Sequence, residues 1–102
     1  MYRGTTPTLT FTFPFDLAGV ECMYITFAQR GEVKLEKELH HCSLSDDATT
    51  ASVCLTQADT LALDCSCGAL DIQIRLKRND GTTLASKIIK TTVGRILKDG
   101  EI

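Results

Sequence analysis

The stretch Leu70-Asp71-Ile72-Gln73-Ile74-Arg75-Leu76-Lys77 alternates apolar and polar residues without a break. Successive side chains of a β-strand point to opposite faces of the sheet, so this period of two predicts a strand with one buried and one solvated face. Residues 8–13 and 32–36 alternate in the same way. Several such strands in 102 residues predict one all-β domain, an immunoglobulin-like or related antiparallel β-sandwich of about seven strands.

The same alternation sets the boundaries and the buried faces of the predicted strands. We expect strands over residues 7–13, 21–29, 32–39, 50–55, 69–77 and 82–93. The apolar parity of each strand should face the core. The inward residues are then Leu9, Phe11, Phe13, Met23, Ile25, Phe27, Ala51, Val53, Leu55, Leu70, Ile72, Ile74 and Leu76. The solvated face of the third strand should consist of Glu32, Lys34, Glu36 and Glu38.

Turn residues separate these strands. Asp16 can cap a single helical turn, and Arg30-Gly31 predicts a tight turn. Thr56-Gln57-Ala58-Asp59 has the spacing of a capping box, in which the threonine hydroxyl accepts from the third N–H of a short helix. Arg78-Asn79-Asp80-Gly81 predicts a hairpin between the two longest strands, with Gly81 at positive φ. Residues 40–47 are predicted to form a polar connection.

The segment over residues 82–93 places apolar residues on both parities. Leu84 and Ile88 share one parity, whereas Ile89 and Val93 share the other. Either a bulge switches the parity near Ser86 and Lys87, or a partner covers the outer face. Of these two explanations we favour the bulge, because bulges are common in edge strands and a covering partner is an additional assumption.

Composition and charge limit the expected binding partners and the expected cellular location of the chain. The net charge is −2, and no stretch is basic enough to bind phosphate backbones, so nucleic acid is not an expected partner. The longest apolar run is far too short to span a membrane, and residues 1–6 lack the apolar core of a signal peptide. We therefore expect the chain in the cytoplasm or in a particle assembled there.

The five cysteines raise the question of disulfides and metal. Their odd number and the expected cytoplasmic location predict free thiols, with Cys22 and Cys54 opposite in parity to the core residues. A zinc site would combine His40-His41-Cys42 with Cys65-Ser66-Cys67. Zinc ligands usually come in pairs separated by two to four residues, and neighbouring histidines on an extended chain should point apart. We therefore predict unpaired thiols, no metal and no cofactor.

No catalytic constellation stands out, so we predict a protein without enzymatic activity. Cys42 with His40 or His41 as its base is conceivable, but sequence neighbours rarely reach the required geometry. Small β-sandwiches serve more often in binding or assembly. Carbohydrate binding would need exposed aromatic side chains, and only Tyr2, Phe15 and Tyr24 lie outside the inferred core.

Several stretches resemble small, largely uncharacterised proteins encoded by phages and prophages of anaerobic gut-type bacteria. The likeness is carried by residues 2–16, 24–29, 55–57, 80–86 and 94–100, which together run over nearly the whole chain. The opening Arg-Gly-Thr strand also resembles, more loosely, the N-terminal domain of phage baseplate upper proteins. The resemblance implies a virion structural or tail-associated role, with other phage structural proteins as partners and a location in the host cytoplasm and then the virion. The alternative is a binding module that recognises a host protein or a carbohydrate.

The end of the chain is the predicted assembly surface. We divide the chain into a sandwich over residues 1–94 and a tail over residues 95–102, which is too short to form a core of its own. The proposed surface consists of Ile88, Ile89, Val93, Ile96, Leu97 and Ile102. An edge strand with unpaired N–H and C=O groups can accept a neighbour, so we expect a homo-oligomer. The alternative is a tail that folds back onto its own sandwich.

Overall fold

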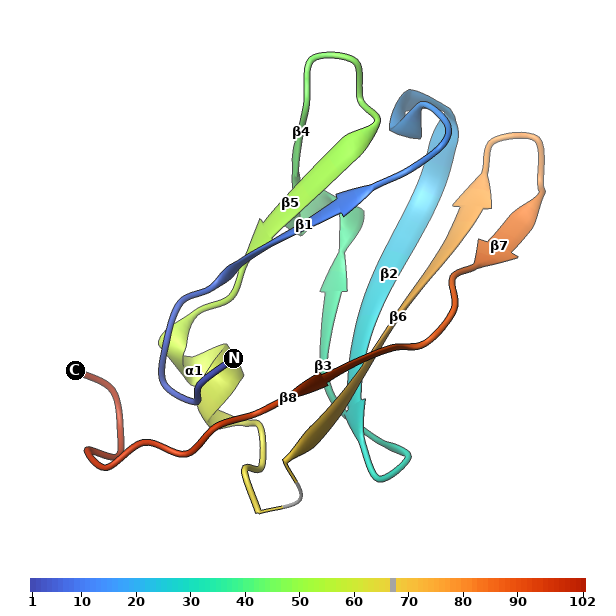
Figure 1. Cartoon of the computed structure of the whole chain (residues 1–102). Helices are drawn as coiled ribbons and strands as arrows, with labels where there is room; N and C mark the ends of the chain where they lie inside the picture. Colours follow the sequence, from blue (N-terminus) through green and yellow to red (C-terminus); the bar gives the residue numbers. More distant parts are fainter. Residues whose placement is uncertain (67) are drawn as a thin grey trace.

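The computed structural model describes residues 1–66 and 68–102 and shows the predicted all-β architecture (Figure 1). A three-stranded antiparallel sheet has the order β1-β5-β4 and packs on a larger sheet with the order β3-β2-β6-β7, in which β8 also pairs with β6. The strands are β1 Thr8–Thr12, β2 Val20–Gln29, β3 Glu32–Glu38, β4 Ser43–Leu44, β5 Thr50–Cys54, β6 Ala69–Arg78, β7 Thr83–Ala85 and β8 Ile89–Thr92. The short helices are η1 Leu17–Gly19, η2 Leu39–His41 and α1 Gln57–Leu61.

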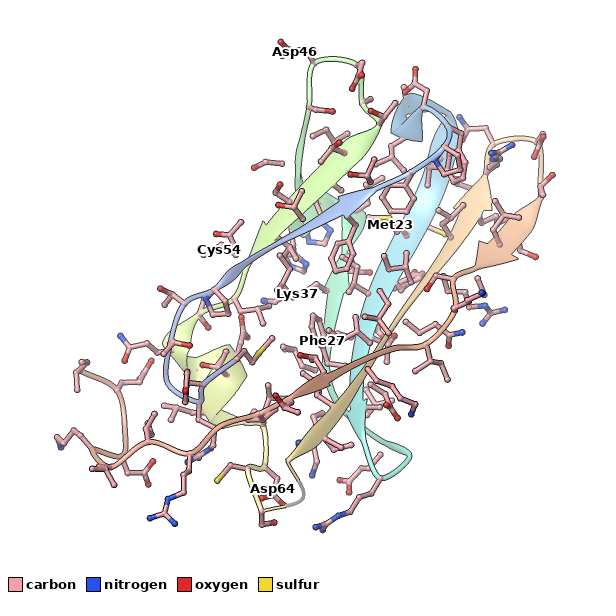
Figure 2. The ribbon with its side chains drawn as sticks, viewed as in Figure 1. Met23, Phe27, Lys37, Asp46, Cys54 and Asp64 are labelled. Atoms are coloured by element: carbon pink, nitrogen blue, oxygen red, sulfur yellow. The ribbon has the colours of Figure 1, made fainter. Side chains whose placement is uncertain are left out.

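The core lies between the two sheets and is built mainly on β2 and β6. These are the longest strands and pair with each other, so that Ile25 opposes Ile74 and Phe27 opposes Ile72. Figure 2 shows Phe27 and Met23 pointing into the space between the sheets, where their exposed fractions are 0% and 1%. The predicted inward faces of β2, β5 and β6 are confirmed, because every residue named for them is buried. Leu9, Phe11 and Phe13 of the first segment are half-buried against this core.

The predicted turns are confirmed. The Asp16 carboxylate accepts from the Ala18 N–H at 2.7 Å, and the Thr56 hydroxyl accepts from the Asp59 N–H at 3.1 Å. Arg30 and Gly31 have φ values of 53° and 75°, and Gly81 has a φ of 91°. One part of the hairpin prediction is wrong, because Gly81 joins the ten-residue β6 to the three-residue β7 rather than joining the two longest strands.

The predicted solvated face of β3 is interrupted by a bulge. Phe27 opposes Leu35, but Ala28 opposes Val33, so one extra residue enters β3 at Lys34. The parity of the strand changes there. Val33, before the bulge, is consequently 59% exposed. Beyond the bulge Lys37 keeps the parity of Leu35 and lies opposite the buried Ile25, on the inner face.

The bulge predicted after β7 is also present and divides the last predicted strand into two. Leu76 opposes Leu84, whereas Ile72 opposes Ile89, a register change of one residue. The Ser86 hydroxyl accepts from the Ile74 N–H at 3.0 Å, which keeps that backbone donor satisfied where the ladder is broken. The predicted polar connection over residues 40–47 contains η2 and β4, which the sequence pattern did not predict.

Candidate functional site

The two long sides of the sandwich differ, and we call the first of them the closed seam. Here β3 continues through η2 directly into β4, so the chain itself crosses from one sheet to the other. The Lys37 ammonium also lies 2.9 Å from the Asp59 carboxylate of α1, and both side chains are mostly buried. Partial burial disfavours the charged carboxylate, but the Lys37 and Thr56 hydrogen bonds outweigh it and hold the pKa of Asp59 below its ordinary value.

The opposite side, which we call the open seam, lies between β1 and the β7–β8 edge (Figure 1). An apolar groove of about 390 Å³ occupies it, lined chiefly by Phe11, Phe13, Phe15, Leu76, Leu84 and Ile89. A second cavity of about 300 Å³ continues along the seam and shares Phe11 and Ile89 with the first. The sandwich therefore leaves part of its core accessible between two strand edges.

The aromatic side chains at this groove are already packed against the protein. The Phe13 and Phe15 rings lie 5.7 Å apart, and the Arg78 guanidinium lies 4.2 Å from the centre of the Phe15 ring. Tyr2 is 62% exposed, yet its ring covers Gly94 so closely that a Cβ there would lie 2.6 Å from it. Tyr24 is 37% exposed. Phe15 therefore offers little free ring face for stacking on a sugar, whereas Tyr2 and Tyr24 are exposed at the surface.

The structure divides the predicted assembly surface into exposed and buried members. Ile88 and Ile89 are 54% and 41% exposed, and Leu97 and Ile102 are 93% and 91% exposed. Val93 is only 4% exposed and belongs to the core, so its assignment to the surface is wrong. The register change after β7 returns this parity to the inner face, which places Val93 inside.

The tail over residues 95–102 is attached to its own domain while two of its apolar side chains remain in solvent. The Gln57 amide donates to the Ile102 carbonyl at 3.0 Å and accepts from the Ile102 N–H at 2.9 Å. The Arg3 guanidinium lies 3.4 Å from the Asp99 carboxylate. Ile96 is half-buried, close to where a Cβ on Gly4 would lie. The tail thus has a defined place in the fold and still presents Leu97 outward.

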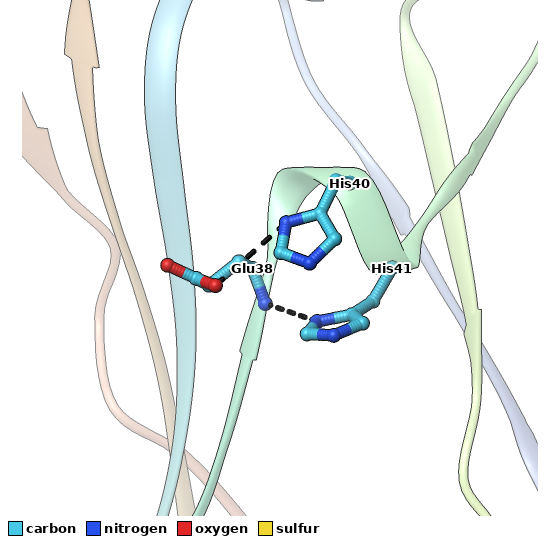
Figure 3. A group of neighbouring side chains, drawn as sticks. All are labelled: Glu38, His40 and His41. Atoms are coloured by element: carbon cyan, nitrogen blue, oxygen red, sulfur yellow. Dashed lines mark hydrogen bonds and ion pairs between the residues drawn. The ribbon is translucent and has the colours of Figure 1, made fainter.

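Glu38, His40 and His41 form a small exposed cluster around η2 (Figure 3). The Glu38 N–H donates to His41 Nδ1 at 2.9 Å, the Glu38 carboxylate lies 3.7 Å from His40 Nδ1, and the imidazole centres are 4.0 Å apart. Our expectation that the two histidines point apart is wrong, because residues 39–41 form a tight helical turn instead of extended chain. The cluster could present nitrogen and oxygen ligands to a divalent metal, but His41 Nδ1 is already the acceptor that caps the turn. In the part of the chain that the structure describes, the group includes no cysteine.

The described cysteines do not form a reactive site. Cys22, Cys42, Cys54 and Cys65 are free thiols, and Cys67, named in the zinc hypothesis, lies outside the described residues. Burial raises the pKa of the Cys42 thiol. A higher pKa leaves less thiolate at neutral pH, which makes Cys42 a poor nucleophile.

The carboxylates of Asp47, Asp59 and Asp80 stabilise local turns. Hydrogen bonds from Ser45 and Thr49 lower the pKa of Asp47, and those from Thr82 lower the pKa of Asp80. Asp59 caps α1 as described above. Each lowered pKa favours the ionised form, so these groups are acceptors in local structure and not proton donors at neutral pH.

Comparison with known proteins finds no family model and no curated protein that matches this chain. Among the described residues, no helix is both long and apolar enough to span a membrane. The sequence pattern identified the exposed tail residues but missed the groove, whose main sequence signal is the uncharged Thr/Leu/Phe alternation of residues 8–13.

Proposed function

We propose that this chain is a non-enzymatic structural protein of a phage or prophage particle and acts by protein–protein assembly. The observation that carries the proposal is the exposure of Leu97 and Ile102, each above nine-tenths, on a tail that hydrogen bonds hold in place. Burying such side chains against a partner is favourable by roughly 1.5–3 kcal/mol each. The sequence resemblance to phage-encoded proteins supports the particle as the place of assembly.

The exposed isoleucines of the β7–β8 edge add to this surface. Ile88 lies in the bulge and Ile89 lines the open groove, so both are near an edge that has free backbone groups. An assembly partner is a protein surface in this proposal, and the likeness implies another phage structural protein. The chain would be made in the host cytoplasm and would then enter the virion.

The proposal is tested on purified particles from the strain that encodes the chain. After prophage induction and density-gradient separation, antibody detection should find the protein in the particle fraction, and a high-salt wash should not remove it. Its complete absence from the particles would overturn the proposed role.

A double variant tests the surface itself. Leu97→Ser with Ile102→Ser should leave folding unchanged, because both side chains are solvent-exposed, but should deplete the protein from particles. Lys98→Ser, an exposed polar change within the same tail, is the matched control and should be incorporated normally. Equal incorporation of all three forms would contradict the tail as an assembly surface.

A further inference from the structure

We propose that β1 is a homotypic docking edge, through which two copies of this chain join by antiparallel pairing of their Thr8–Thr12 strands about a two-fold axis at Thr10. This inference rests on the proposed function, since it names a second copy as one partner in assembly. It concerns a different surface from the tail, so the two can be tested separately.

The first argument comes from the direction of the backbone groups of β1. The Leu55 N–H donates to the Pro7 carbonyl at 2.9 Å, and the Phe13 N–H donates to the Thr49 carbonyl at 2.8 Å. In an antiparallel pair the residues that exchange hydrogen bonds alternate with those that do not. The backbone hydrogen-bonding groups of residues 7, 9, 11 and 13 therefore point toward β5. The backbone N–H and C=O groups of Thr8, Thr10 and Thr12 point the other way, beyond the edge of the sheet.

This free edge is complementary to itself. An antiparallel copy centred on Thr10 places Thr8 of one chain opposite Thr12 of the other, and Thr10 opposite Thr10. Each of these pairs has outward donors and acceptors, so the two strands could form about six backbone hydrogen bonds. The three-stranded sheets would join into one continuous sheet across the axis.

Charge distinguishes this edge from the others. β3 carries five charged residues among seven, β4 is two residues long, and the β7–β8 edge is interrupted by a bulge and carries Lys87 and Lys90. Charges, short length and bulges are the usual protections against edge pairing. β1 has none of them, and two copies joined at Thr10 would bring no like charges together along the strand.

The side chains suit the same arrangement. Thr8, Thr10 and Thr12 are exposed and would form cross-strand threonine pairs on the outer face. On the inner face, Leu9 of one copy would lie opposite Phe11 of the other. Both residues are half-buried beside the open seam, so pairing would cover the apolar groove that the isolated fold leaves accessible.

The position of Thr10 on the axis allows a charge-exchange experiment on the purified full chain. Analytical ultracentrifugation should show self-association of the wild type. Thr10→Lys and Thr10→Glu should each weaken it roughly tenfold or more, because each places two like charges opposite each other. An equimolar mixture of the two variants should recover association. Ser52→Lys, on the outer face of the neighbouring strand, is the control and should associate like the wild type.

A proline substitution tests the backbone contribution. Thr10→Pro removes an outward N–H that the monomer does not need, and proline is tolerated where the N–H of an edge strand faces solvent. It should abolish association while circular dichroism remains that of the folded protein. Thr10→Val keeps the N–H and should remain associated.

The outcomes separate this inference from the proposed function. A wild type that stays monomeric at high concentration, or a lysine–glutamate mixture that gains nothing over the single variants, overturns pairing at β1. If that chain is still found in particles, the proposed function stands without it. A dimer with charge exchange at Thr10 that is absent from particles supports the pairing and overturns the role in the particle.

Discussion

The two seams of this sandwich are closed to different degrees by the same chain. At the closed seam, η2 carries β3 into β4, and Lys37 reaches the carboxylate of Asp59. At the open seam, a backbone bridge between Tyr2 and Gly94 closes one end, and an apolar groove of about 390 Å³ remains between β1 and the β7–β8 edge. A short connection between the two sheets therefore closes one side of this sandwich. The side without such a connection leaves core side chains accessible to a partner.

Phe27→Ala should have the largest effect, because it would leave a cavity in the core between the two seams. The side chain is fully buried, and removing it should reduce the free energy of unfolding by about 3–5 kcal/mol. Phe13→Ala, at the open seam, should cost only about 1–2 kcal/mol because that ring is already partly solvated. Urea unfolding of both variants measures the difference, and equal losses would show that the open seam is packed as tightly as the core.

Gly81→Val should have the next largest effect, because Gly81 lies in the turn between β6 and β7 and so positions β7 at the open seam. Its φ of 91° resists a β-branched residue, so the variant should lose about 1–3 kcal/mol of stability. Gly19 has open space and an ordinary φ, which makes Gly19→Val the matched control. A melting temperature of Gly81→Val that equals that of the control would contradict the strain at Gly81.

Asp59→Asn tests the closed seam and should cost roughly 1–2 kcal/mol at pH 7. The folded state lowers the pKa of Asp59, so the native protein holds the ionised form more tightly than the unfolded chain does. The contribution is complete above the unfolded pKa of about 3.9 and is lost as the pH falls through the lower folded value. The difference in unfolding free energy between wild type and variant should therefore shrink at about pH 3; a difference that grows on acidification would have the wrong sign.

Gln57→Ala should have the smallest effect, since the tail that it releases closes neither seam. Global stability should change by less than about 0.5 kcal/mol, while the Ile102 amide should exchange with solvent faster because its acceptor is removed. Gln57→Glu keeps an acceptor oxygen and should protect that amide better than alanine does. Unchanged exchange in Gln57→Ala would show that the tail is held by other contacts.

The strands that form the closed core could be predicted because their alternation is uninterrupted. Residues such as Ile25 and Ile74 keep the same parity along β2 and β6, and the turn chemistry at Gly81 is local. The exposure of Val33 could not be predicted, because one extra residue at Lys34 moves Val33 to the outer face, and nothing in the local pattern marks that insertion. The open groove depends on which strands from separate sheets become neighbours, a property of the whole topology and not of any segment.

The tail illustrates the same limit at the predicted site. Its exposed apolar residues Leu97 and Ile102 are visible in the sequence, but the anchor at Gln57 comes from a helix 45 residues away. The burial of Val93 could not be predicted, because apolar residues near it occupy both parities. Only the register of β8 against β6 shows which parity faces the core.

The position of β1 in the chain also has a kinetic consequence. Its partners in β5 follow 38 to 46 residues later, as the pairs Thr12 with Thr50 and Thr8 with Cys54 show. At synthesis rates of about 5–20 residues per second, this strand leaves the ribosome roughly 2–9 s before its ladder can form. During that interval an uncharged, alternating segment has both edges free, and aggregation then competes with folding. The flanking Pro7 and Pro14 limit how far an improper ladder can extend, so they protect the nascent chain as well as delimit the finished strand.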